Sequence, residues 1–414
     1  SMRIGVDLTA WAADGGQSRY TREILAAMVE GSPNHEYYLY AAPSQREAIQ
    51  LPARDVHWRP VELTSIAPGQ ANGSAHALSL ADRVRLWRAV RQGVKRDRLR
   101  TFFLPSLRTW FPTPLALPSV VAVHDPDPGD AARRGFERAG ERRAFRLSAR
   151  LAAGRARALV CPSEFVAERL AENCGVDRGA HPGKIRVARP APSATFRAPA
   201  SPEDVAAGRG RANLPGGART LLYVGGFGGK ETAAALVRAP APPARGRGRP
   251  PYLVLVGDGG ASSSPSQVAD LRVLARAGGS EAHVRWLEGL GERELRGLVA
   301  DAVCCVQPGY ADGLALAAVD AAAQGTPSVA TIQGSAAELL GGATLPCDPF
   351  DLATLVEGLE RLIDDAALRE QLGARAREAA LALDWKSAAR ELVVALADVS
   401  RIARFPLLPW VASD

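Results

Sequence analysis

One segment, 302–327, holds a strand, a turn and a helix in close succession, and it constrains the fold more than any other part of the chain. The apolar run 302–306 is typical of a buried parallel strand, and the turn residues QPG at 307–309 end it. Leucine, alanine and valine dominate 314–323, and Gly325 follows as a helix stop. A buried strand that leads directly into a helix predicts an α/β fold with a parallel sheet.

Two aspartates accompany this predicted helix. Asp312 lies near its N-cap, and Asp320 lies about two turns further along. The free backbone N–H groups at a helix start and the aligned peptide dipoles favour a bound phosphate. The segment alone leaves two interpretations open. One is a phosphate- and sugar-binding site, and the other is a capping Asp312 with a solvated or paired Asp320.

The alternation of strand and helix occurs in both halves of the chain. It runs from the first strand at 2–8 to a last strand near 184–188, and it restarts at 220–224. Between them, 196–217 loses periodicity and is rich in proline, glycine and alanine, which is typical of a linker. The sequence therefore predicts a first domain over 1–195, a second over 218–384, and a terminal helix and tail over 385–414 that returns to the first domain.

Glycine-rich loops follow the first strand of each half. Gly15 and Gly16 precede a helix in the first half, and Gly225 and Gly226 precede Lys230 in the second. Such loops let backbone N–H groups approach a phosphate, and they are equally common where a turn needs positive φ. The spacing before Lys230 does not match a Walker loop, and neither loop matches a nicotinamide-binding fingerprint.

His124 directly follows the buried strand 119–123. In an open parallel sheet, ligands bind at the carboxyl ends of the strands. His124 is therefore a candidate ligand-contacting residue, and a histidine that caps its own loop is the alternative.

Composition excludes several classes of protein. The five cysteines lack paired metal or disulfide spacing, which predicts reduced thiols, and the scattered histidines predict no metal site. No apolar run has the length of a membrane span, and we expect a cytoplasmic protein with peripheral membrane contact left open. The net charge of +7 comes from dispersed arginine without a recognition motif, which argues against nucleic acid as a partner.

The order of these pieces closely resembles the family 4 retaining glycosyltransferases, which have two facing Rossmann-like domains (GT-B). The likeness extends over nearly the whole chain. The matching segments are GGQSRYTREIL at 15–25, VVAVHD at 120–125, CPSEF at 161–165, LLYVGG at 221–226, LVLVGDG at 253–259 and ADGLALAAVD at 311–320. The resemblance implies a GT-B fold and transfer of a sugar from a nucleotide-diphospho-sugar to a small-molecule or saccharide acceptor, with retention and without a metal or other cofactor.

The resemblance also implies roles for individual residues. His124 would contact the transferred sugar, Lys230 would neutralise the diphosphate, and Asp320 would meet the ribose hydroxyls. Asp312 would hold hydroxyls of the donor sugar. The implied donor-binding set is Gly15, Gly16, Gly225, Gly226, Lys230, Asp312, Gly313, Leu314, Ala315, Leu316 and Asp320.

The chain departs from the family pattern at this same site. Two family glutamates are Asp312 and Asp320 here, which withdraws each carboxylate by up to about 1.5 Å. Glycine and proline of the motif become Ala315 and Ala317, and Gly226 stands where many members have arginine. These changes keep two alternatives open, a catalytically degenerate relative that acts as a partner or scaffold, and a nucleotide-sugar epimerase of the same fold.

Overall fold

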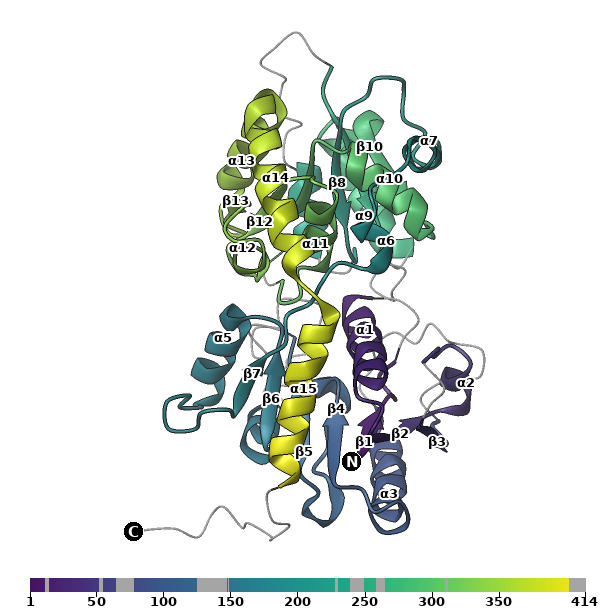
Figure 1. The fold of residues 1–414 in the computed structure, drawn as a ribbon. Helices are drawn as coiled ribbons and strands as arrows, with labels where there is room; N and C mark the ends of the chain where they lie inside the picture. Colours follow the sequence, from purple (N-terminus) through teal and green to yellow (C-terminus); the bar gives the residue numbers. More distant parts are fainter. Residues whose placement is uncertain are drawn as a thin grey trace.

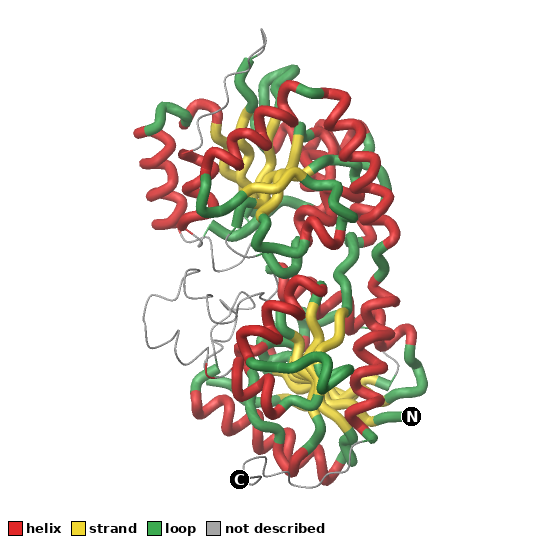
Figure 2. The backbone as a smooth tube through the Cα atoms, turned by 90° about the vertical axis from the view of Figure 1, so that its left-hand side faces the viewer, coloured by secondary structure: helices red, strands yellow, loops and turns green. Residues whose placement is uncertain are grey.

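The computed structural model describes residues 1–11, 15–51, 55–64, 78–124, 147, 149–227, 230–238, 249–257, 265–309 and 312–401. Two α/β domains lie one above the other, and each has a central parallel sheet between helices (Figures 1 and 2). The predicted fold class is confirmed.

The first domain has a seven-stranded sheet in the order β3-β2-β1-β4-β5-β6-β7. All of its pairings are parallel. The order reverses direction between β1 and β4, where a doubly wound sheet opens a crevice for ligands. The strands are β1 (Arg3–Asp7), β2 (Glu36–Ala41), β3 (Val56–Pro60), β4 (Thr101–Leu104), β5 (Ser119–Ala122), β6 (Ala158–Cys161) and β7 (Ile185–Val187).

The second domain repeats this topology with six strands in the order β10-β9-β8-β11-β12-β13, again all parallel. Its reversal lies between β8 and β11, so β11 leads into the crevice as the sequence predicts. The strands are β8 (Thr220–Val224), β9 (Tyr252–Val256), β10 (Val284–Leu287), β11 (Cys304–Gln307), β12 (Ser328–Thr331) and β13 (Leu345–Cys347).

Helices cover both faces of each sheet. In the first domain they are α1 (Gly16–Gly31), α2 (Pro43–Arg46), α3 (Leu80–Arg96) and α5 (Glu164–Cys174). After it come α6 (Ala194–Arg197), α7 (Pro202–Arg211), α8 (Lys230–Arg238), α9 (Pro265–Ala277), α10 (Glu292–Asp301), α11 (Leu316–Ala323), α12 (Ala336–Leu339), α13 (Leu352–Asp364), α14 (Ala366–Ala382) and α15 (Trp385–Ser400).

Strand side chains alternate between two apolar cores in each domain. In β1, Ile4 and Val6 pack on the same side as Phe103, whereas Phe102 and Leu104 of β4 belong to the opposite core. Because both faces are covered, these strands are apolar at nearly every position, which is why they are recognisable in the sequence.

The terminal helix returns to the first domain, as predicted (Figure 1). Asp384 caps α15 by accepting from the backbone N–H groups of Lys386 and Ser387. Trp385 is buried and donates from its indole nitrogen to the Pro192 carbonyl oxygen at 3.3 Å. Leu392 lies in the first-domain core that also contains β1. The chain therefore crosses between the domains twice.

The predicted linker over 196–217 is more ordered than its composition suggests. It contains the end of α6 and all of α7, and α7 packs closely on α10. A Cβ atom on Gly297 would lie 2.0 Å from the Asp204 carbonyl oxygen, so this close approach requires glycine. The strand β3 is also absent from the sequence prediction. The sequence also predicts an arginine-rich helix over 131–155, of which residues 131–146 and 148 lie outside the described residues.

Candidate active site

Asp312 lies beyond the carboxyl end of β11, and the neighbouring loop fixes its backbone. Its N–H donates to the Gln333 carbonyl oxygen at 3.1 Å, and its carbonyl oxygen accepts from the Ser335 N–H at 2.9 Å. A Cβ atom on Gly334 would lie 2.8 Å from the Asp312 carbonyl oxygen, so the bridge leaves room only for glycine. The sheet and this bridge together hold Asp312 at the sheet edge.

The helix α11 begins at Leu316, two residues later than predicted. Its N-cap is Ala315, which is buried and has a left-handed backbone with φ 49° and ψ 30°. The Asp312 Oδ1 atom accepts from the Ala315 N–H at 2.9 Å. Asp312 therefore caps the turn before the helix rather than the helix itself, which realises part of the capping interpretation.

Asp320 lies on α11 and is paired with the other domain. Its Oδ2 and Oδ1 atoms accept from the two terminal nitrogens of Arg19 at 2.5 and 2.8 Å. Oδ1 also accepts from the Ser193 N–H at 3.3 Å. Burial by itself would lower the pKa of Arg19. The charge and the hydrogen bonds of the Asp320 carboxylate together have the larger, opposite effect, so the pKa of Arg19 is raised overall.

The start of α1 faces the start of α11. Gly15 has φ 106° and ψ 152°, a conformation that side-chain-bearing residues rarely adopt. A Cβ atom on Gly16 would lie 3.6 Å from methyl carbons of both Leu314 and Leu316. The structure therefore brings together the first-domain glycines and the 312–316 loop, which the sequence predicts as one site.

His124 lies at the carboxyl end of β5 but is 4% exposed. Its Nε2 atom donates to the Pro105 carbonyl oxygen at 3.0 Å, and its ring packs edge-on against Tyr20 with centroids 4.8 Å apart. This histidine holds a neighbouring loop, in line with the capping alternative, and its proposed sugar contact is not tested by these bonds.

The second glycine loop is shaped by Tyr223. The phenol donates to the Gly226 carbonyl oxygen at 2.8 Å, and a Cβ atom on Gly225 would lie 2.7 Å from the phenol oxygen. The absence of a side chain at Gly225 therefore leaves room for the phenol in its present position. Lys230 begins α8, and its side chain lies outside the described residues.

Asp7, the last residue of β1, is a candidate site residue that was not predicted from the sequence. It accepts from Thr9 Oγ1 and Thr109 Oγ1, each at 2.6 Å, and burial nevertheless raises its pKa. Asp7 also lines a small cavity with Trp11 and Gln17 beside the start of α1. A polar residue at the end of an apolar strand is the signal that identifies such a position.

Arg19 and Glu338 were also missed. The Glu338 carboxylate accepts from the Glu164 and Phe165 N–H groups at 2.8 and 2.9 Å, so a second-domain side chain caps the first-domain helix α5. Beside it, the hydroxyl oxygens of Ser163 and Ser335 lie 2.6 Å apart. Arg19 and Glu338 could not be picked out among the many charged residues of the sequence, because the role of each depends on how the two domains pack together.

The model for Glycosyl transferases group 1 matches residues 206–379, and the model for Glycosyltransferase Family 4 matches 14–190. The chain belongs to the family 4 glycosyltransferases. A D-inositol 3-phosphate glycosyltransferase from Nocardioides sp. is 31% identical over 241 residues, which are 54% of this chain and 50% of that protein. The chain thus spans about half the length of this curated relative.

Solved structures of low sequence identity share the fold of this family 4 glycosyltransferase. Sucrose-phosphate synthase from Thermosynechococcus elongatus has a TM-score of 0.74 at 18% identity, with 96% of this chain and 99% of that chain covered. HepE from Anabaena in complex with UDP-glucose has a TM-score of 0.66 at 14% identity, with coverages of 96% and 100%. Both have the GT-B fold.

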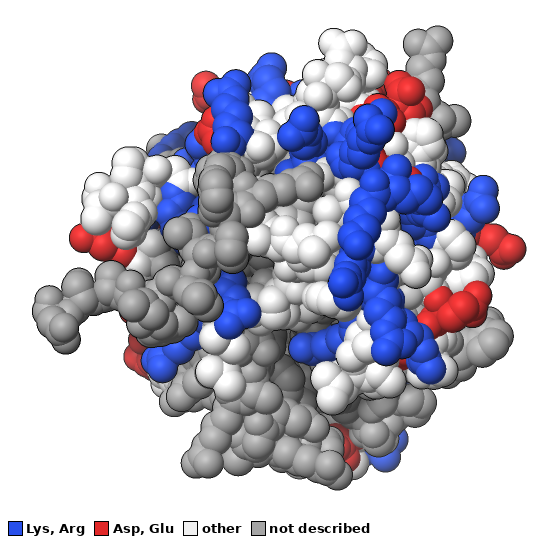
Figure 3. Space-filling model, turned by 90° about the horizontal axis from the view of Figure 1, so that it is seen from below, with Lys and Arg blue, Asp and Glu red and all other residues white. Residues whose placement is uncertain are grey.

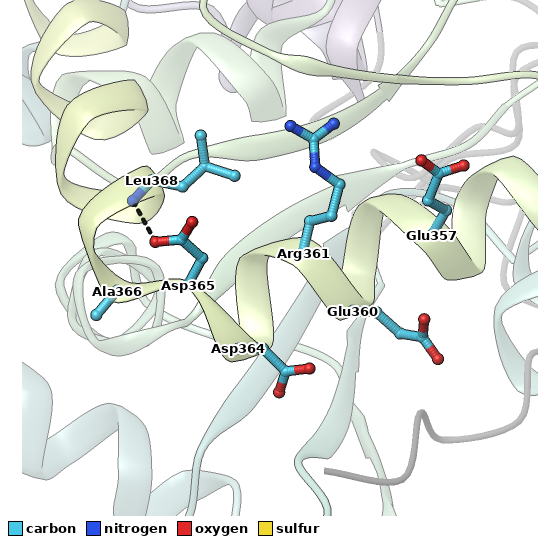
Figure 4. A pocket seen from close by; sticks show the side chains of 7 residues that line it. All are labelled: Glu357, Glu360, Arg361, Asp364, Asp365, Ala366 and Leu368. Carbon is cyan, nitrogen blue, oxygen red and sulfur yellow. Dashed lines mark hydrogen bonds between the residues drawn. The ribbon is translucent and has the colours of Figure 1, made fainter. Parts of the chain in front are cut away.

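A hollow on the outside of the second domain is a poor alternative site. It lies along α13 and the start of α14, away from the edge where β11 ends (Figures 1 and 4). Four of its lining residues are acidic and one is basic, so the hollow would repel a diphosphate. Its lining is formed by Glu357, Glu360, Arg361, Asp364, Asp365, Ala366 and Leu368.

Basic side chains are also prominent on one end of the molecule. Lysine and arginine gather on the end of the first domain seen from below, where α3 lies (Figures 1 and 3). This end points away from the second domain. The exposed cations of α3 are Arg85, Arg88, Arg91, Lys95 and Arg96.

Among the described residues there is no group of three or more histidine, cysteine or acidic side chains that could hold a metal. The five cysteines form no disulfide, and burial raises the pKa of Cys305 and Cys347 to about 12. Among the residues that the structure describes, no helix has both the length and the apolar character needed to span a membrane.

Proposed function

We propose that the chain is a retaining glycosyltransferase that transfers a sugar from a nucleotide-diphospho-sugar to a small-molecule or saccharide acceptor. The observation that carries the proposal is the position of Asp312 and the start of α11 at the reversal point of the second sheet, where Leu314 and Leu316 face Gly16 of the first domain. That crevice is where doubly wound sheets bind nucleotides, and the helix start supplies N–H groups for a diphosphate.

The proposed chemistry is departure of a nucleoside diphosphate. Negative charge develops on the leaving diphosphate, and the backbone N–H groups at the start of α11 are oriented to stabilise it. Lys230 would supply a cation at the first turn of α8, and Asp312 would orient the donor sugar through its hydroxyls. Because these groups provide the charge stabilisation, the proposal requires no metal.

Relatives guide the choice of substrates. HepE is seen with UDP and with UDP-glucose, which makes UDP-glucose the first donor to assay. The curated relative is named for D-inositol 3-phosphate, so a polyol phosphate is the first acceptor to assay. We propose that the acceptor binds on the first domain near Asp7 and Trp11, since their cavity adjoins the start of α1.

A catalytically degenerate relative, acting as a partner or scaffold, is the second candidate. The observation that favours it is the engagement of both Asp320 oxygens by Arg19, together with the left-handed Ala315 where the family motif has glycine. In that case the crevice would bind a nucleotide weakly or not at all.

Proton NMR of nucleotide-sugar consumption tests the proposal. The enzyme is incubated with UDP-glucose, GDP-mannose and ADP-glucose, with and without EDTA, and with a polyol phosphate as acceptor. We expect consumption of one donor, an anomeric configuration retained in the product, and no effect of EDTA. Asp312→Ala should lower the rate on the order of a hundredfold, because it removes an interaction made to the reacting sugar.

Turnover of no donor, or equal turnover by Asp312→Ala, would favour the degenerate relative. Asp365→Ala is the matched control, because Asp365 caps α14 in the same domain by accepting from the Leu368 N–H. This control removes a capping aspartate without touching the crevice.

A further inference from the structure

The pair between Arg19 and Asp320 joins the two domains at the proposed donor site. Arg19 lies on α1 of the first domain and Asp320 on α11 of the second. Both terminal guanidinium nitrogens face both carboxylate oxygens, at 2.5 and 2.8 Å, which is the bidentate arrangement. The Arg19 side chain is 19% exposed and that of Asp320 is 8% exposed, so the pair is shielded from water.

The bonds to Asp320 leave little acceptor capacity unused. An ionised carboxylate has about four lone-pair sites. Oδ1 accepts from Arg19 and from the Ser193 N–H, whereas Oδ2 accepts from Arg19. About one site therefore remains, on Oδ2, and a single donor such as a ribose hydroxyl would complete the set. The orientation of that site is fixed by the guanidinium.

The same contact includes the proposed diphosphate-binding loop. Arg19 lies one turn after Gly16, and Gly16 packs against Leu314 and Leu316 at the start of α11. A rigid helix thus connects the glycine that faces the loop with the arginine that holds Asp320. Movement of one domain relative to the other would change the loop and the carboxylate together.

We propose that Arg19 is a positioning residue of the donor site, which orients Asp320 for a ribose hydroxyl and couples donor binding to the contact between the domains. This inference rests on the proposed function. Asp320, which would bind the ribose, belongs to the second domain. Arg19, which sets the orientation of the Asp320 carboxylate, belongs to the first domain. Arg19 itself need not touch the donor.

The experiment compares nucleotides with and without ribose hydroxyls. Dissociation constants of UDP, GDP and ADP, and of their 2′,3′-dideoxy counterparts, are measured by calorimetry on the full chain. The nucleotide that binds the wild-type protein most tightly is then used with Arg19→Gln, Arg19→Lys and Glu338→Gln. Circular dichroism and thermal melts confirm that each variant is folded.

For the wild type we expect the ribonucleotide to bind about tenfold or more tightly than its dideoxy counterpart, since a hydroxyl then donates to a charged carboxylate. Arg19→Gln should reduce this ratio to about one, and Arg19→Lys should give an intermediate ratio. Glu338→Gln alters a separate contact between the domains but leaves Asp320 oriented, so the ratio should stay at the wild-type value.

A full ratio in a folded Arg19→Gln variant would overturn the positioning role while leaving the proposed function intact. An equal loss of the ratio in Glu338→Gln would also overturn it, because any loosening of the domains would then suffice. Failure of the wild-type protein to bind any of the three ribonucleotides at millimolar concentration would overturn the inference. If dTDP is not bound either, the proposed function fails with it.

Discussion

Two of the contacts between the domains are made by carboxylates that work in different ways. Asp320 accepts a bidentate arginine in a buried setting, whereas Glu338 accepts two backbone N–H groups at the start of α5. The Glu338 side chain is 26% exposed, against 8% for Asp320. The first contact lies within the proposed donor site, and the second lies beside it. Under the proposed function, the first contact would serve ligand binding, whereas the second would help to hold the domains together.

The largest effect on stability should come from Asp320→Ala. The change leaves Arg19 buried without its partner, and breaking a buried pair in this way costs about 3–5 kcal/mol. Urea unfolding monitored by fluorescence measures the shift. Asp301→Ala, which breaks a more exposed pair with Arg209 within the second domain, should cost no more than about 1 kcal/mol. Equal costs would remove the distinction between the two kinds of contact.

A cluster of three charged residues inside the first domain, Asp97 with Arg59 and Arg96, sharpens the comparison. Burial of Asp97 favours its neutral form, but hydrogen bonds from Arg59 and Arg96 outweigh this and lower its pKa to about 2. A carboxyl with a lowered pKa stabilises the fold above its unfolded pKa, and this stability is lost as pH falls through about 2.

When unfolding is measured between pH 7 and pH 2, the unfolding midpoint should therefore decrease mainly as the pH drops below about 4. In Asp97→Asn, this acid-dependent loss of stability should be smaller. At pH 7, the free energy of unfolding of the variant should be about 2 kcal/mol lower than that of the wild type. Unchanged acid sensitivity in Asp97→Asn would show that other carboxylates dominate.

Glu338→Ala should lower the free energy of unfolding by less than Asp320→Ala or Asp97→Asn. The variant removes a capping carboxylate from α5, and loss of a helix cap typically costs about 1 kcal/mol. Small-angle X-ray scattering should show a modest increase in the radius of gyration, because the contact joins the domains. A loss as large as that of Asp320→Ala would contradict the division between the two contacts.

The smallest effect should come from Ala315→Gly. A left-handed backbone costs a residue with a side chain about 1–2 kcal/mol, which glycine would relieve. Against this, the variant loses a buried methyl group worth about 0.8 kcal/mol and gains unfolded-state entropy worth about 0.5–1 kcal/mol. We therefore expect a change within about 1 kcal/mol in the free energy of unfolding. A larger gain would mean that the loop is strained beyond Ala315.

Local sequence patterns predicted most of the fold. The strand β8 was predicted with its observed bounds, because a strand buried on both faces is apolar throughout. Low helix propensity obscured α7, whose formation depends on close packing of Gly297 against it. The start of α11 was displaced by two residues because the left-handed Ala315 cannot be inferred from composition.

The candidate site was predicted in its outline but not in its contacts. Asp312 and the facing glycines follow from motifs at the ends of strands. The partner of Asp320 does not, because Arg19 lies 301 residues away in the sequence and meets it only when the domains pack together. Many arginines were equally eligible, and only the three-dimensional structure selects one.

The most direct test of the donor site is a thermal-shift screen of the purified chain against UDP, GDP, ADP and dTDP. A ligand that binds the folded state raises its melting temperature by mass action. We predict a selective rise with one nucleotide that is abolished in Lys230→Ala and reduced in Asp320→Ala, each compared with its own ligand-free melt. No rise with any nucleotide at millimolar concentration, or an undiminished rise in both variants, would contradict a donor site at the start of α11.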